Sequence, residues 1–196
     1  MRPLRQADRE APAQGSPVRE PLYQGQAGRR ARPLNPRARL AVVLYGVAAL
    51  AYLLDRITKL LAEQHLFARP PIVLIPGVLQ LRYTTNSGGA FGLFPGQPWL
   101  FFVATVAVCV VIVVAASRGL TSRRAAFGLG LILGGALGNL TDRIVRGPST
   151  TGGWRGISGG VVDFVDFHIW PVFNLADSAI VIGVLLVVLT GARRQA

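Results

Sequence analysis

Four long apolar blocks constrain the fold of this chain more than any other feature. They cover approximately residues 40–61, 99–117, 125–144 and 175–192. A helix rising about 1.5 Å per residue needs roughly 20 apolar residues to cross the hydrocarbon core of a bilayer. Hydrophobic residues make up 51% of the chain and charged residues only 15%, as is typical of an integral membrane protein. We therefore predict an all-α membrane protein with four transmembrane helices.

Positive charge is concentrated beside these blocks. The formal net charge is +12 at pH 7, and nine arginines precede Leu40. In a soluble protein this would suggest a nucleic-acid partner. Most of the other basic residues flank apolar blocks, in the 118–124 loop and at Arg193 and Arg194, and basic flanks stay in the cytoplasm. We therefore expect no nucleic-acid partner, cytoplasmic N- and C-termini, and both long loops on the outer side.

The N-terminal segment differs in composition from the rest. Residues 1–38 are rich in Arg, Pro, Gln, Gly and Ala and show no apolar periodicity, so they cannot bury enough surface to offset the entropy of ordering. A cleavable targeting peptide fits poorly, because the basic region is too long and the next apolar run ends in charges. The sequence predicts a disordered cytoplasmic tail over 1–38 and a four-helix membrane domain over 39–196.

The segment between the first two blocks predicts a small structure on the outer side of the membrane. Residues 72–83 are rich in Val, Ile and Leu around Pro76-Gly77, which favours short strands on the outer surface. Next comes Asn86-Ser87-Gly88-Gly89-Ala90-Phe91-Gly92. Its small residues would let an extended peptide approach the backbone closely, and Asn86 offers a donor and an acceptor. A plain turn also explains this composition. The Gly/Ser/Thr-rich segment 147–160 predicts a mobile loop.

The third block has a stripe of small residues. Gly130, Gly134 and Gly138 recur every four residues, and this spacing forms a groove against which another membrane helix can pack. We predict that the third helix is central in the bundle.

Acidic residues cluster at the start of the last block. Asp163, Asp166 and Asp177 lie among apolar and aromatic residues. A charge in the membrane costs roughly 2.5–3.5 kcal/mol even on lenient scales, so such residues mark function. Asp55 and Lys59, spaced i,i+4, can pair, although Lys59 could simply extend to the interface. The four-helix topology brings eight polar residues to one outer edge: Asp55, Asn86, Asn139, Asp142, Arg143, Asp163, Asn174 and Asp177.

Two of these acids suggest a reaction. Carboxylates close together in a poorly solvated site share one proton, and the pair can deprotonate a water molecule and protonate a leaving amine. This is aspartic protease chemistry, and we select Asp163 and Asp177. Asp177 lies in a first helical turn, where the helix dipole favours the ionised form. Asp163, flanked by Val162 and Phe164, is the candidate for the protonated partner. Asp166 remains an alternative second acid.

Other chemistries have weaker support. Cys109 is the single cysteine, and His65 and His168 are far apart, so we expect no disulfide, no metal site and no cofactor. Gly156-Ile157-Ser158-Gly159-Gly160 matches the serine hydrolase pattern, but it lies in a Gly/Ser tract without a strand-turn-helix context. A transporter or proton-conducting bundle would need acids across the bilayer, whereas these gather at one edge.

Five motifs together resemble the lipoprotein signal peptidases, also called signal peptidase II. They are Asp55 with Lys59, Asn86-x-Gly-x-Ala-Phe-Gly, Gly138-Asn139-Leu140-Thr141-Asp142-Arg143, Val161-Val162-Asp163-Phe164 and Phe173-Asn174-Leu175-Ala176-Asp177-Ser178. They occur in the right order over about residues 40–192. This chain departs from the family pattern at Gly89, where alanine is commoner, and in a longer segment between Arg143 and Asp163.

The resemblance implies a four-helix bundle with a small extracytoplasmic β-cradle in the bacterial inner membrane. It implies that Asp163 and Asp177 are catalytic, and that the substrate is a prolipoprotein whose cysteine carries diacylglycerol, cut on the N-terminal side of that cysteine. It implies substrate binding by Asn86, Gly89, Ala90, Phe91, Asn139 and Arg143, with support from Asp55, Lys59, Asp142 and Asn174. Membrane lipids would be the other partners, and we expect a monomer.

Overall fold

The computed structural model describes residues 35–86, 98–120, 122–146 and 160–192 of this chain. Across these ranges it contains four helices, α1 (Pro36–Leu66), α2 (Pro98–Arg118), α3 (Arg123–Val145) and α4 (Leu175–Ala192). Each helix is long and apolar enough to cross a membrane. The four predicted spans are thus confirmed, and the ends of α4 match the predicted ones.

The first helix is longer at both ends than the apolar block that predicts it. The side chain of Asn35 accepts a hydrogen bond from the Ala38 N–H at 2.9 Å, and Pro36 occupies the first turn. Both residue types favour a helix start at these positions. The helix therefore begins inside the segment assigned to the N-terminal tail. Residues 1–34 lie outside the described residues, so the disordered tail stays a prediction.

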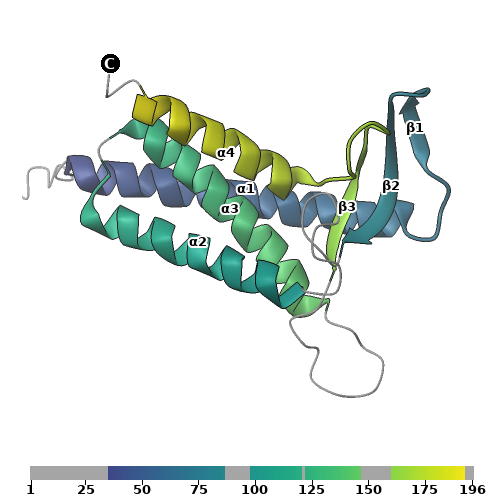
Figure 1. Cartoon of the computed structure of the whole chain (residues 1–196), viewed down its shortest axis with the longest axis horizontal. Helices are drawn as coiled ribbons and strands as arrows, with labels where there is room; N and C mark the ends of the chain where they lie inside the picture. The colour runs from purple at the N-terminus through teal and green to yellow at the C-terminus, as the bar shows by residue number, and fades with distance from the viewer. Residues whose placement is uncertain (1–34, 87–97, 121, 147–159, 193–196) are drawn as a thin grey trace, which may run out of the picture. The chain divides into compact units, whose positions relative to one another are not determined.

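Helix α3 is the centre of the bundle, as its glycines predict, and contacts α1, α2 and α4 (Figure 1). A Cβ on Gly130 would lie 2.6 Å from the Leu44 carbonyl oxygen of α1, and one on Gly135 would lie 2.5 Å from the Ala176 carbonyl oxygen of α4. Neither helix could come this close to a larger residue. The glycines thus place α1 and α4 directly against the backbone of α3.

Three strands form a small antiparallel sheet in the order β1-β2-β3. The strands are β1 (Ile72–Ile75), β2 (Leu79–Asn86) and β3 (Val161–Asp166). The short strands around Pro76-Gly77 were predicted; they form a hairpin, and Gly77 in its turn has φ +72°, which favours glycine. The third strand was not predicted. Its pairing of Asp163 with Thr84 of β2 connects the acidic stretch to this hairpin.

The sheet lies at one end of the bundle (Figure 1). The opposite end carries the start of α1, the connection between α2 and α3, and the last turn of α4. Val162 of β3 is fully buried and clusters with Ala62 and Leu66 from the last two turns of α1. This contact holds β3 against the bundle where the polar residues gather.

Candidate active site

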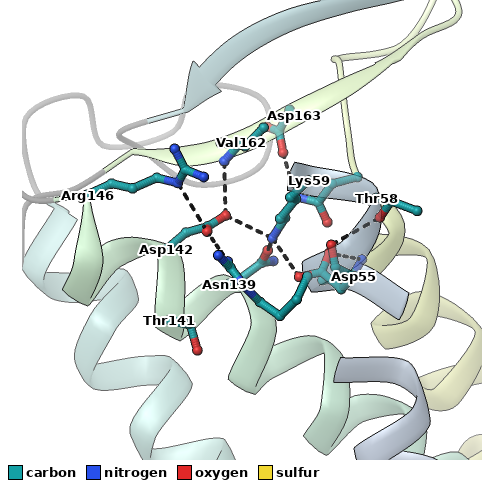
Figure 2. Close-up of polar contacts among 12 residues, drawn as sticks. Asp55, Thr58, Lys59, Asn139, Thr141, Asp142, Arg146, Val162 and Asp163 are labelled. Carbon is teal, nitrogen blue, oxygen red and sulfur yellow. Dashed lines mark hydrogen bonds and ion pairs between the residues drawn. The ribbon is translucent and has the colours of Figure 1, made fainter. Parts of the chain in front are cut away.

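A fully buried lysine organises the polar end of the bundle. The Lys59 ammonium lies 2.8 Å from the Asn139 Oδ1, 2.9 Å from the Asp55 Oδ2 and 3.0 Å from the Asp142 Oδ2 (Figure 2). All three partners are buried. An ammonium group has three N–H donors, and here each donor has an oxygen within reach. Lys59 thus binds α1 to α3 and offsets two buried negative charges.

Asp55 extends this network to the last helix. Its Oδ1 accepts a hydrogen bond from the Ala176 N–H at 3.0 Å, and Ala176 lies in the first turn of α4. Free N–H groups at a helix start favour a carboxylate. Gly138 makes room for this contact, because a Cβ at that position would overlap the Asp55 carboxylate. The predicted pairing of Asp55 with Lys59 therefore also fixes the start of α4.

Asn174 and Asp177 cap α4 reciprocally. The Asn174 Oδ1 accepts from the Asp177 N–H at 3.0 Å, and the Asp177 Oδ2 accepts from the Asn174 N–H at 3.2 Å. This arrangement resembles a capping box, with aspartate in place of the usual glutamate. The Asp177 Oδ1 also accepts from the Asn139 Nδ2 at 2.8 Å. Both oxygens of Asp177 thus act as hydrogen-bond acceptors.

Asp163 lies on the other side of Asn174. The Asn174 Nδ2 donates to the Asp163 Oδ1 at 2.6 Å, and the side chain of Asn86 also hydrogen-bonds to Asp163. Asp163 is only 2% exposed, whereas Asp177 is half-buried. Burial, and next the negative charge of Asp177, raise the pKa of Asp163 to about 7 against the partly opposing hydrogen bonds of the two asparagines. Asn174 thus contacts both acids.

Arg143 adds positive charge beside this pair. It is buried in the last turns of α3, and its charge interacts with Asp177, Asp163 and Asp142. The guanidinium carbon lies 5.9 Å from the centre of the Phe101 ring of α2, within the range of a cation–π contact. Arg143 is therefore placed to attract an electron-rich group near the acids.

Asp142 links the helices to β3. Its Oδ2 accepts from the Val162 N–H at 3.2 Å, and its Oδ1 contacts Arg56 and, at 3.3 Å, the Arg146 Nε (Figure 2). The Val162 N–H belongs to the residue before Asp163. Asp142 therefore holds the strand that carries Asp163.

Asp166 belongs to a different cluster. Its carboxylate accepts from the Gln80 Nε2 at 2.8 Å, the Arg82 Nε at 2.6 Å and the His168 N–H at 2.9 Å. These hydrogen bonds, that of Gln80 first, lower the pKa of Asp166 to about 2. Asp166 thus binds β2 and the turn after β3, while Asp163 contacts Asn174.

The structure brings together most of the predicted site residues, namely Asp55, Lys59, Asn86, Asn139, Asp142, Arg143, Asp163, Asn174 and Asp177. Gly89, Ala90 and Phe91 lie outside the described residues, as does Ser158 of the serine hydrolase pattern. Within the described residues, His, Cys, Asp and Glu side chains form no group of three that could bind a metal ion.

Sequence reasoning missed three charged residues of this network, Arg56, Glu63 and Arg146. The Arg146 Nη1 and Nη2 lie 2.9 and 2.8 Å from the Glu63 Oε1 and Oε2. The spacing of Asp142 and Arg146, i,i+4 on one helix face, was a signal for the Arg146 contact. The contact of Glu63 with Arg146 joins residues 83 positions apart and had no local signal.

This chain is similar to known proteins in sequence and in fold. The profile of the family described as Signal peptidase (SPase) II matches residues 47–193. The lipoprotein signal peptidase of Rhodococcus jostii is 44% identical over 160 residues, which cover 81% of this chain and 76% of that protein. That of Syntrophomonas wolfei is 43% identical over 155 residues, covering 77% and 96%.

Two solved structures described as bacterial membrane enzymes have the same fold. One superposes with a TM-score of 0.67 at 26% identity, covering 78% of this chain and 89% of the other. The second has a TM-score of 0.61 at 27% identity, covering 75% and 90%. With the four apolar helices, the sequence matches identify a bacterial membrane protein with protease function. The chain belongs to the signal peptidase II family, whose curated members are lipoprotein signal peptidases.

Proposed function

We propose that this chain is an aspartic endopeptidase that removes the signal peptide from prolipoproteins. Its substrate would carry diacylglycerol on a cysteine, and the cut would fall on the N-terminal side of that cysteine. The observation that carries the proposal is the pair of carboxylates on either side of Asn174, which donates a hydrogen bond to Asp163 at 2.6 Å and to Asp177 at 3.2 Å. A carboxylate pair in a poorly solvated site can divide acid and base roles.

The surroundings of the two acids suggest how the roles divide. Asp163 is the more buried acid, and its pKa of about 7 lets it hold a proton near neutral pH. Asp177 accepts N–H donors on both oxygens and is the better base. Asp177 would remove a proton from water as the water oxygen attacks the scissile carbonyl carbon. Asp163 would give its proton to the leaving nitrogen as the carbon–nitrogen bond breaks.

Polar side chains around the pair could hold the substrate backbone. Asn86 ends β2 and would offer its backbone and amide to an extended peptide. Arg143, attracted by both acids, would stabilise charge that develops on the carbonyl oxygen. Asn139 would keep Asp177 in place. We also propose that the substrate peptide binds along Gly89, Ala90 and Phe91.

We also propose an orientation in the membrane. The start of α1, the end of α2 and the start of α3 lie opposite the sheet (Figure 1). These helix ends contain Arg37, Arg39, Arg118, Arg123 and Arg124. Basic residues flanking membrane spans favour the cytoplasm. The site would then face the outer side of the bacterial inner membrane, with both termini in the cytoplasm, and the protein would act as a monomer without a cofactor.

The decisive experiment compares two precursor peptides with the same sequence, one with diacylglycerol on its cysteine and one without. The purified protein in detergent should cleave only the lipidated peptide, and mass spectrometry should place the new N-terminus at the lipidated cysteine. Cleavage of both peptides at equal rates would contradict the proposed specificity.

Variants test the catalytic pair. Asp163→Asn and Asp177→Asn should each abolish cleavage while the protein still inserts and purifies, because each removes an ionisable group from the pair. Asp166→Asn is the matched control, since Asp166 pairs with Arg82, and it should retain most of the activity. Full activity in either of the first two variants would rule out the aspartic mechanism.

A further inference from the structure

The position of Asp163 depends on how β3 is held at the neighbouring residue, Val162. The Val162 side chain is fully buried in a cluster with Ala62 and Leu66. Its N–H donates to the Asp142 Oδ2 at 3.2 Å. The side chain and backbone of this one residue thus fix the strand against both α1 and α3.

The Asp142 carboxylate has to keep one orientation for this contact. Its Oδ2 also lies 3.0 Å from the Lys59 Nζ, while its Oδ1 faces Arg56 and Arg146. Rotation of the carboxylate would therefore exchange partners of both oxygens. On the Oδ2 side, Lys59 also contacts Asp55, and on the Oδ1 side, Arg146 also contacts a second carboxylate.

That second carboxylate is Glu63, next to the Ala62 on which Val162 packs. Arg146 follows directly after the end of α3, and its two terminal nitrogens bind the two Glu63 oxygens at 2.9 and 2.8 Å. Its remaining nitrogen, Nε, faces Asp142 at 3.3 Å. A planar guanidinium with two parallel hydrogen bonds is fixed in direction. Arg146 therefore fastens the last turn of α1 to Asp142.

We propose that Glu63 and Arg146 are positioning residues for Asp163, acting through Asp142 and the Val162 N–H. The inference rests on the proposed aspartic mechanism. Loss of the pair leaves the Asp142 Oδ1 with Arg56 but without Arg146 and loosens β3 against α1, so that Asp163 shifts relative to Asp177. Reactions between positioned groups are sensitive to displacements of about 1 Å, which can cost a hundred-fold in rate.

Displacement of Asp163 should change the pH–rate profile, which a general loss of stability would not do. The charged and polar groups that face Asp163 come from four elements, Lys59 of α1, Arg143 of α3, Asn86 of β2, and Asn174 and Asp177 at the start of α4. Burial and the Asp177 charge both raise the pKa of Asp163. A loosened strand weakens both effects, so the alkaline limb of the pH–rate profile should move to lower pH.

The test uses Arg146→Gln, Glu63→Gln and the double variant of the full chain, with the diacylglyceryl precursor peptide as substrate. Arg146→Gln should lower kcat about ten-fold or more with KM changed less than two-fold, because a misplaced acid affects the reaction rather than binding. The alkaline limb should shift downward. Since Glu63 acts through Arg146, the double variant should be no slower than Arg146→Gln alone.

Arg82→Gln is the matched control. It breaks the arginine–carboxylate pair that Arg82 of β2 forms with Asp166 of β3, and it should leave the pH–rate profile unshifted. An Arg146→Gln protein with unchanged kcat would overturn the proposal, as would a loss of activity that merely follows a lower folded fraction with no shift of the alkaline limb. If Asp163→Asn retains activity, the aspartic mechanism fails instead, so the two failures are distinguishable.

Discussion

At the scale of single residues, Lys59 determines which atoms of the hydrogen-bond network donate and which accept. A lysine can only donate, so the Asn139 Oδ1, 2.8 Å away, has to face it. The Asn139 Nδ2 then points to Asp177 and donates to it at 2.8 Å. The amide of Asn139 therefore has one orientation that satisfies both neighbours. Lys59 thus determines that Asn139 presents its Nδ2 donor to Asp177.

The pKa of Asp163 leads to a prediction on pH. If Asp163 supplies a proton, kcat/KM should fall as pH rises through about 7, the pKa of Asp163 in the folded protein. The folded state also binds this proton more tightly than the unfolded state does, so the contribution of Asp163 to stability is largest at low pH. It is lost as pH rises from about 4 to about 7.

Two measurements check this prediction. The first is the pH dependence of cleavage of the lipidated peptide. The second is the thermal unfolding midpoint of the wild type minus that of Asp163→Asn. This difference should decrease as pH rises over this window, because Asp163 loses its proton and asparagine does not titrate. A pH-independent difference would contradict the raised pKa.

At the scale of elements, α3 holds the site because its glycines let two helices approach. A Cβ on Gly138 would overlap the Asp55 carboxylate, which contacts both Lys59 and the Ala176 N–H. The same helix carries Asn139 and Asp142, which contact the residues around both acids. One helix thus supplies the close packing and the polar contacts.

Gly138→Ala should disrupt the site more than the fold. The added methyl group displaces Asp55 and costs about 1–3 kcal/mol as overpacking, while cleavage should fall at least ten-fold because the start of α4 moves. Gly46→Ala in α1 is the control, since a Cβ there meets nothing within 4 Å; it should leave cleavage unchanged and should not lower the stability, because alanine favours a helix more than glycine does. Thermal unfolding in detergent and the cleavage assay measure both. Wild-type activity in Gly138→Ala would contradict the role of this close contact.

Elements with a local signal were predictable from the sequence, and those that depend on distant partners were not. Length and hydropathy predicted the four spans, and the spacing of Gly130, Gly134 and Gly138 predicted a central α3. Strand β3 was missed because its pairing partner, β2, lies about 80 positions earlier. Likewise, the spacing of Asp55 and Lys59 indicated a pair, but nothing local indicated that Lys59 also binds Asn139 and Asp142.

At the scale of the whole molecule, the two ends of the bundle differ in chemistry. The sheet and the acids lie at one end, and exposed Arg123 and Arg124 lie at the other. The proposed orientation follows from this asymmetry, since arginines beside membrane spans favour the cytoplasm.

Cysteine labelling in intact cells tests this orientation. In a Cys109→Ser background, Val78→Cys at the exposed turn between β1 and β2 should react with a membrane-impermeant maleimide added outside. Arg124→Cys, exposed at the opposite end, should react only after the cells are permeabilised. The reverse pattern would place the site in the cytoplasm and contradict the proposed topology.

The contact between Asp55 and the Ala176 N–H joins the first membrane helix to the last, and this bears on how the protein is made. During synthesis α1 leaves the ribosome long before α4, and until then Asp55 lacks its partner at Ala176. The proposed catalytic pair is also incomplete until then, because Asp177 itself lies on α4. On the proposed mechanism, the nascent chain would acquire its proteolytic capacity only when its final helix has inserted, and a product truncated before α4 would be inert.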